Sequence, residues 1–343
     1  MKQFFIIISI FTLVLLNSCK TYDFFSITVL EPAEIALPVN YQKLVIMHNL
    51  YRTPTDTAGT SYNLFDQIKT DTTYLYDEIA TESIYALRDF LNTSVRFEAT
   101  IFDSIRHHFP KLSDDFTMND LDILRQICHQ NNADAVILLN KLSTFDKYEV
   151  VYDRYGTYMG EFGVRITATW FFIDPFKSKL TDLKEITEVF YYQTDPWYFN
   201  EGIKELKFRK DVLTKSGGEI GINYGKRISP NWSETDRIVF KNGSREIRKG
   251  YKEAQLGNWE KAEIFWQQAL ENPQTINLAR ATFNLGLASE MNGSLEPAIE
   301  WVQKSVEIFP DTINKFYLQI LEKRLQQQDD IFYQMEGSNS NKP

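Results

Sequence analysis

The sequence predicts an α+β protein, with an N-terminal α/β domain built on a mixed sheet and C-terminal all-α helical repeats. Two observations predict this fold class. Short apolar runs alternate with amphipathic helical patterns between residues 43 and 241. From residue 243 onward, small and bulky residues recur at a fixed spacing within helical patterns.

Residues 1–18 have the pattern of a secretory signal peptide. Lys2 supplies a positive charge, and residues 4–16 form an apolar run of the length that such signals use, about 7–15 residues. A membrane-spanning helix needs about 20 apolar residues, and Asn17 and Lys20 end this run too early. We therefore expect the segment to be removed after export.

The four residues Leu16-Asn17-Ser18-Cys19 resemble the lipobox of bacterial lipoproteins. The resemblance implies cleavage before Cys19, lipidation of this cysteine, and a lipidated tether over residues 19–42. It also implies an anchor in the bacterial envelope, by default in the outer membrane facing the periplasm, because no dense acidic run follows Cys19. The alternative is an ordinary cleaved signal in which the cysteine stands by chance.

Composition limits the partners and the redox chemistry. The chain has 343 residues, 43% of them hydrophobic, which is enough for two domains with a real core. Its net charge of −9 argues against nucleic acid as a partner. Once Cys19 is modified, Cys128 has no cysteine left to pair with, and we expect it to be a buried small hydrophobe.

The α/β domain is expected over residues 43–241. Apolar runs predict strands, and apolar residues at steps of three and four predict helices. Asn132 and Ala133 introduce the clearest strand, which is apolar on both faces and therefore central in its sheet. The predicted strands are 43–50, 95–102, 133–140, 163–173, 186–193 and 237–240, and the predicted helices are 74–91, one beginning near Thr117–Asp120, and 209–228.

The helix predicted at 209–228 carries Gly217, Gly221 and Gly225 on one face. Each glycine inside a helix costs about 1 kcal/mol relative to alanine. Three of them are tolerable only where another part of the chain packs very close to the backbone, and we expect this part to be the sheet. Lys215 and Glu219 exclude a membrane-spanning segment.

A resemblance rests on this order of elements. The strand containing Leu44-Val45-Ile46, the strand after Asn132-Ala133-Asp134-Ala135 and the glycine-rich helix ending in Arg227-Ile228-Ser229-Pro230 together resemble the α/β domain of envelope lipoproteins related to the curli-secretion lipoprotein and the TolB amino-terminal domain. The chain is also similar to an uncharacterised family of tetratricopeptide-bearing lipoproteins. The resemblance implies a domain that binds partner proteins and is not a catalyst.

The C-terminal part repeats with a period of 36 residues, since Gly250, Gly257, Ala262 and Trp266 are echoed at Gly286, Gly293, Ala298 and Val302. This pattern resembles the tetratricopeptide repeat, whose usual period is 34. We expect two such repeats with a capping helix over residues 243–335, followed by a disordered tail over residues 336–343. Small residues are expected where two helices cross.

The first helix of each repeat would line a groove for envelope proteins or peptides. The candidate lining residues are Ile247, Tyr251, Gln255, Phe283, Leu287, Glu290, Tyr317, Leu321 and Arg324. The alternative is that these residues bury against the N-terminal domain.

No known catalytic or cofactor motif, such as GxGxxG or HExxH, occurs in the chain. His107 and His108 are adjacent and so point to different faces, which makes a poor metal site. We therefore expect no cofactor, no metal and no catalytic residue. The predicted function is a membrane-anchored, non-catalytic scaffold for other envelope proteins, and the alternatives are an oligomeric ring or secretion subunit and a hydrolase of a wall polymer.

Overall fold

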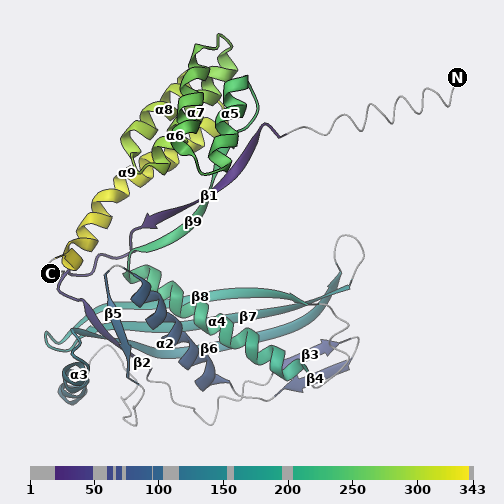
Figure 1. Ribbon diagram of the computed structural model, residues 1–343. Helices are drawn as coiled ribbons and strands as arrows, with labels where there is room; N and C mark the ends of the chain where they lie inside the picture. Colours follow the sequence, from purple (N-terminus) through teal and green to yellow (C-terminus); the bar gives the residue numbers. More distant parts are fainter. Residues whose placement is uncertain are drawn as a thin grey trace. The chain divides into compact units, whose positions relative to one another are not determined.

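A computed structural model describes residues 20–48, 60–64, 67–71, 75–94, 96–102, 116–152, 158–194 and 204–339. These residues form two compact units (Figure 1). The α/β unit comprises Glu31–Asn231 with the end of the chain from Asp330, and the helical unit comprises Trp232–Asp329 with the residues up to Leu30. The predicted fold class is confirmed, because one unit is built on a mixed sheet and the other is mainly helical. The leader, Cys19, His107 and His108 lie outside the described residues.

The α/β unit is organised by a five-stranded sheet in the order β5-β2-β6-β7-β8. The strands are β2 (Lys43–His48), β5 (Glu98–Ile101), β6 (Ala135–Tyr152), β7 (Tyr158–Asp174) and β8 (Lys179–Thr194). β2 runs parallel to β5 and β6, whereas β6, β7 and β8 are antiparallel neighbours. β6 is central, as predicted, but it continues beyond the apolar run because its polar second half pairs with β7. A separate pair consists of β3 (Thr60–Leu64) and β4 (Gln67–Asp71).

Helices pack on both faces of this sheet (Figure 1). α2 (Tyr76–Thr93) and α4 (Lys204–Ile228) bury one face, where the Trp170 ring stacks on that of Tyr224 at 5.1 Å between centroids. α3 (Met118–Asn131) covers β2 and β6 on the other face. It begins at Thr117 with a capping box, as the sequence predicts. Its Cys128 is fully buried, and burial raises the pKa of this thiol to about 12, so it packs as a hydrophobe.

The glycine face of α4 meets α2, not the sheet as we expected. A side chain at Gly221 would collide with the backbone carbonyl of Ser83. The Ser83 hydroxyl donates to the carbonyl of Gly217 at 2.7 Å. The sheet side of α4 instead carries bulky residues such as Tyr224. Because α4 has no side chains at these positions, the two helix backbones lie close enough for the Ser83 hydroxyl to bond the main chain of α4.

Buried ion pairs join α4 to the sheet. Arg209 donates to the Asp146 carboxylate at 2.7 Å, and both side chains are almost fully buried. Asp182 of β8 accepts from Arg227 at 2.8 Å and from the Tyr224 hydroxyl at 3.2 Å. Truncating one member of such a pair leaves an uncompensated buried charge, so these contacts fix the position of the helix.

The helical unit contains a two-stranded sheet of β1 (Tyr22–Glu31) and β9 (Asn231–Phe240). Its helices are α5 (Arg245–Gln255), α6 (Trp259–Gln268), the short 3₁₀ helix η2 (Ala269–Glu271), α7 (Thr275–Met291), α8 (Leu295–Ile308) and α9 (Thr312–Asn339). Residues 22–31, expected as a tether, form a strand because β9 pairs with them. α9 extends to Asn339, beyond the expected start of a disordered tail.

The 36-residue spacing corresponds to two helical hairpins. Gly250 lies against the Trp266 indole, and Gly286 lies against Val302, so a side chain at either glycine would collide with the second helix of its hairpin. Gly257 and Gly293 both have φ +77° in the turns between the helices, a conformation that favours glycine. The expectation of small residues at the helix crossings is confirmed.

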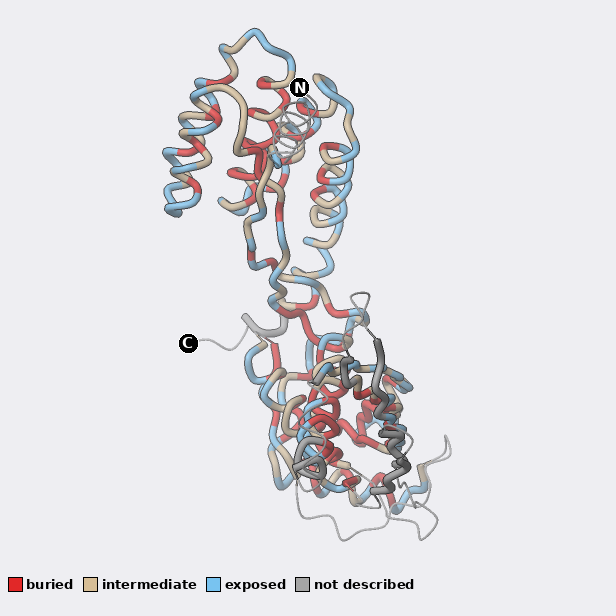
Figure 2. Tube along the Cα trace, turned by 90° about the vertical axis from the view of Figure 1, so that its right-hand side faces the viewer, coloured by how far each residue is buried: buried red, intermediate tan, exposed pale blue. Residues whose placement is uncertain are grey.

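Buried residues gather inside each unit, shown red along the trace in Figure 2. No helix among the described residues has both the length and the apolar character needed to cross a membrane.

Candidate binding surfaces

The groove predicted on the helical repeats is filled by the unit's own strands. Six of its nine expected lining residues are buried: Ile247, Phe283, Leu287, Glu290, Tyr317 and Leu321. Tyr251 and Arg324 are half-buried, and Gln255 is exposed. Val239 and Phe240 of β9 belong to the same apolar clusters as Leu287 and Phe283. The lining residues therefore hold β9, which the sequence assigned to the α/β domain.

Asn284 of α7 binds the main chain of β9. Its amide nitrogen donates to the carbonyl of Phe240, and its amide oxygen accepts from the N–H of the same residue, each at 2.8 Å. Asn284 is fully buried, so these two bonds satisfy a polar side chain that would otherwise be costly inside the unit. The arrangement recognises an extended backbone independently of its side chains.

Glu290 of α7 binds one side chain of β9, that of Arg237. Its carboxylate accepts from Arg237 at 3.0 Å through two guanidinium nitrogens and from the Tyr317 hydroxyl at 2.6 Å. Arg324 of α9 also donates to it. The pKa of Tyr317 is raised, first by burial and then by the adjacent carboxylate, so its hydroxyl remains a donor.

β1 is held at the rim of the same face. The Tyr251 hydroxyl donates to the Asp23 carboxylate at 2.7 Å, and the Gln255 amide donates to the Tyr251 hydroxyl at 2.7 Å. Lys241 also pairs with Asp23, at 3.3 Å. The pKa of Asp23 is lowered, chiefly by the tyrosine hydrogen bond. Several of the expected groove residues thus contact the chain's own strands. Ile247 instead packs with Ala269 and Ala281. Gln255 is linked to β1 through Tyr251.

Two residues of this contact were missed from the sequence, Asn284 of α7 and Arg237 of β9 itself. A signal for Asn284 was present, because an asparagine inside the apolar pattern of α7 needs a hydrogen-bonding partner. Arg237 gave no comparable signal, because its carboxylate partner lies on another element.

The outer face of the sheet, opposite α2 and α4, exposes aromatic and aliphatic side chains. Across β6, β7 and β8, one row of this face contains Phe145, Arg165 and Val189. The next row contains Lys147, Gly163 and Tyr191. Phe145 is 61% exposed and Tyr191 is 67% exposed. We call the surface formed by Phe145, Arg165, Val189, Gly163 and Tyr191 the outer patch.

A hollow of about 220 Å³ lies within the outer patch. The Arg165 guanidinium lies over the Phe145 ring, 5.8 Å from its centroid. The Tyr191 ring approaches the Cα side of Gly163, where an added side-chain carbon would be 3.6 Å away. These large rings offer apolar area to a partner. Aromatic side chains have few rotamers, so ordering them on binding costs little conformational entropy.

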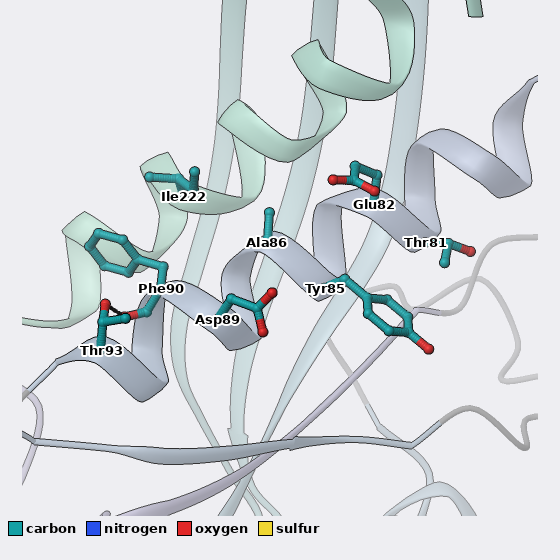
Figure 3. Close-up of a pocket in the computed structure, with 8 residues that line it drawn as sticks. All are labelled: Thr81, Glu82, Tyr85, Ala86, Asp89, Phe90, Thr93 and Ile222. Atoms are coloured by element: carbon teal, nitrogen blue, oxygen red, sulfur yellow. Dashed lines mark hydrogen bonds between the residues drawn. The ribbon is translucent and has the colours of Figure 1, made fainter. Parts of the chain in front are cut away.

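A second, wider hollow of about 720 Å³ follows the outer side of α2 (Figure 3). The Phe90 ring lies toward α4, near Ile222, whereas the Tyr85 ring points away from α4. Its polar lining includes Glu82 and Asp89, but no histidine, cysteine or lysine. The hollow therefore offers carboxylates and an aromatic rim on an open surface.

No group of three or more histidine, cysteine or acidic residues is placed to hold a metal ion within the part of the chain that the structure describes. Ser216-Gly217-Gly218 lies inside α4, with Ser216 fully buried and its hydroxyl bonded to the carbonyl of Val212 at 2.8 Å. This segment is helix interior and not a loop open to a phosphate.

Some solved structures are similar to the chain over about a third to two thirds of its length. They include a minor lipoprotein from Acinetobacter baumannii (14% identity, 56% of this chain and 98% of that one, TM-score 0.25) and a putative neuraminyllactose-binding hemagglutinin homolog from Helicobacter pylori (9%, 65% and 93%, TM-score 0.29). The rare lipoprotein B from Shewanella oneidensis is another (19%, 32% and 85%, TM-score 0.19). These scores are too low to support an argument about this chain.

No curated protein matches the sequence. Family models match both parts of the chain. One, described as a domain of unknown function (DUF6340), matches residues 248–323, within the helical unit. The other matches residues 41–240, which is more than half of the chain. The chain therefore belongs to the family described as a domain of unknown function (DUF8603).

Proposed function

We propose that the protein is a lipid-anchored scaffold of the bacterial envelope, attached through Cys19 and binding other envelope proteins without catalysing a reaction. The lipobox-like segment supports the anchor, and we place the protein in the outer membrane facing the periplasm. The similarity of the α/β part to curli-secretion and TolB-like domains, and of the helical hairpins to tetratricopeptide repeats, supports a role in protein binding.

The single observation that carries the proposal is the outer patch. Exposed aromatic side chains gathered on one surface are typical of protein-binding sites, and Phe145 and Tyr191 are both more than 60% exposed. The repeat groove is already occupied by β9. We therefore propose the outer patch as the surface that receives a partner, with the helical hairpins acting as a holder for β1 and β9.

The test compares partner recovery from intact cells after crosslinking. The double variant Phe145→Ala/Tyr191→Ala removes both exposed rings, and we expect at least a tenfold fall in partner recovery. Both positions are exposed, so each substitution changes the free energy of unfolding by no more than about 0.5 kcal/mol. Leu256→Ala, at a residue that is 73% exposed in the helical unit, is the matched control and should leave recovery unchanged.

Unchanged recovery in the double variant contradicts the assignment of the outer patch and returns partner binding to the helical unit. A fall in both variants indicates general loss of the protein, which immunoblotting of the same cells detects.

A further inference from the structure

β8 forms one edge of the five-stranded sheet. It is 16 residues long, and β7 alone pairs with it among the residues that the structure describes. The other side of an edge strand presents N–H and carbonyl groups that can pair with another strand, and proteins usually keep such edges short or otherwise blunted. β8 is long enough to pair, and its charged side chains, Lys184 and Glu188 among them, restrict pairing to a strand whose charges complement them.

From Asp182 onward, after a bulge near Thr181, the side chains of β8 alternate between the two faces. Even-numbered residues such as Ile186 and Phe190 pack toward the core beneath α2 and α4. Odd-numbered residues point to the outer face, where Leu183 is 45% exposed and Val189 is 44% exposed. Lys184 and Glu188 are half-buried on the even side.

We propose that two copies of this chain pair through β8, antiparallel and around a twofold axis at Ile186, so that the two sheets become one continuous sheet. A C₂ interface uses the same surface on both copies and so must be self-complementary. The β8 sequence meets this requirement on both faces at once.

In this register Lys184 of each copy lies opposite Glu188 of the other on the helix-covered face. On the outer face, Leu183 of each copy lies opposite Val189 of the other. Directly opposite residues have Cβ atoms about 4.5–5.5 Å apart, where opposite charges and apolar pairs stabilise the ladder. Two charge pairs and two aliphatic pairs form from a single strand.

Neighbouring registers lack this complementarity. An axis at Lys184 sets two lysines opposite each other, and an axis at Glu185 sets two glutamates opposite each other. An axis at Thr187 pairs neither Lys184 nor Glu188 with a charge. Like charges directly opposite are destabilising, so the charge pattern of β8 favours the axis at Ile186 over these three. An axis at Leu183 also sets opposite charges, Lys184 and Asp182, across the pair. The Asp182 carboxylate, however, is already bound by Arg227 and Tyr224.

This inference goes beyond the proposed function, because the partner is a second copy and the contact is the edge of the sheet. Phe145 and Arg165 lie on β6 and β7, away from that edge, and stay available to another protein. Tyr191 lies on β8 itself. The single variant Phe145→Ala leaves β8 unchanged, so it separates loss of partner recovery from loss of self-association.

The register is tested with cysteines in the full chain, purified in detergent. In the double variant Leu183→Cys/Val189→Cys, each cysteine at position 183 lies opposite the cysteine at position 189 of the other copy. A disulfide needs Cβ atoms about 3.5–4.5 Å apart, which small shifts of two directly opposite residues can reach. We expect a covalent dimer under mild oxidation. Each single variant should stay uncrosslinked, because its two copies of the same position lie far apart, and mixing the two single variants should restore the crosslink. The native chain controls for Cys128.

The charge pairs are tested by sedimentation of the same full chain. Lys184→Glu and Glu188→Lys should each raise the dissociation constant of the dimer roughly tenfold, because two like-charge pairs replace two attractive pairs. The variant with both substitutions restores opposite charges and should regain the native constant. Circular dichroism checks that all variants are folded. A monomeric native chain, a crosslink in the single variants equal to that of the double variant, or no recovery in the charge swap overturns the proposal.

Discussion

At the scale of single residues, close approach between two main chains determines which substitutions a position tolerates. Gly221 and Gly218 are both inside α4, yet their surroundings differ. A Cβ atom at Gly221 would collide with the backbone carbonyl oxygen of Ser83 and crowd its carbonyl carbon. At Gly218 it would lie 3.5 Å from the side chains of Ala86 and Glu82, an ordinary contact distance.

This difference predicts that a glycine-to-alanine substitution changes the free energy of unfolding in opposite directions at the two positions. Gly221→Ala should destabilise the α/β unit by about 2–3 kcal/mol, because overpacking forces α2 and α4 apart. Gly218→Ala should stabilise it by about 0.5–1 kcal/mol through helix propensity alone. Urea denaturation of both variants checks this, and equal effects at the two positions would show that α2 does not approach α4 as described.

Glu290 is a second residue whose surroundings decide its role. Its carboxylate is buried beside Arg237 and Arg324 and receives the Tyr317 hydroxyl. From the sequence alone, Glu290 either lines an open groove or is buried. The structure buries it as an ionic centre of the helical unit.

We expect Glu290→Gln to lower the free energy of unfolding of the helical unit by about 3–5 kcal/mol, because two arginine charges lose their shared carboxylate inside the unit. Glu300→Gln, at an exposed position on α8, should change it by less than about 0.5 kcal/mol. Thermal unfolding measures both, and a native-like melting temperature for Glu290→Gln would be incompatible with the buried network.

At the scale of elements, the turn between β7 and β8 depends on one carboxylate. Asp174 is buried and accepts from the backbone N–H groups of Phe176 and Lys177, each at 3.0 Å, and from the Tyr41 hydroxyl at 2.9 Å. Burial alone would raise its pKa, but these hydrogen bonds and the Lys177 ammonium lower it below the ordinary value.

The direction of this shift sets a pH dependence. A carboxylate whose pKa is lower in the folded state contributes stability above its unfolded pKa of about 4, and this contribution disappears as pH falls through the folded pKa. Asp174→Asn should therefore cost about 2 kcal/mol at pH 7, and the difference from the native chain should shrink below pH 4. Tyr41→Phe should show a smaller change of the same sign, and a constant difference at all pH values would refute the link.

Elements encoded by local patterns were predicted well, and those that depend on distant partners were not. The helix start near Thr117 and the hairpins spaced by 36 residues are readable from neighbours in the chain. The close approach at the glycines of α4 is readable in the same way, but the element that approaches is α2 and not the expected sheet. β1 and β9 pair across about two hundred residues, and no local pattern states such a pairing. For the same reason, candidate groove residues could be named from the sequence, while β9, which several of them contact, could not be assigned to the helical unit.

At the scale of the whole molecule, the protein divides into two units that contribute differently to the proposed role. The helical unit holds β9 through Asn284 and Glu290 and holds β1 through Tyr251. The α/β unit presents the outer patch and the strand β8, which is an edge of the sheet among the described residues. β1 follows Cys19 after two residues, so a lipid anchor at that cysteine would attach next to a strand of the helical unit.

The anchor is tested by Cys19→Ala in the full chain. Two or more acyl chains make membrane attachment stable, whereas a protein without them is held only by weak surface contacts. We expect the variant to leave the membrane fraction and the native chain to remain in it after a high-salt wash, which removes electrostatic attachment. Cys128→Ala is the matched control, because its thiol is buried, and it should remain bound. A Cys19→Ala variant that stays in the washed membranes would show that the leader is not processed as a lipobox and that another part of the chain holds the protein there.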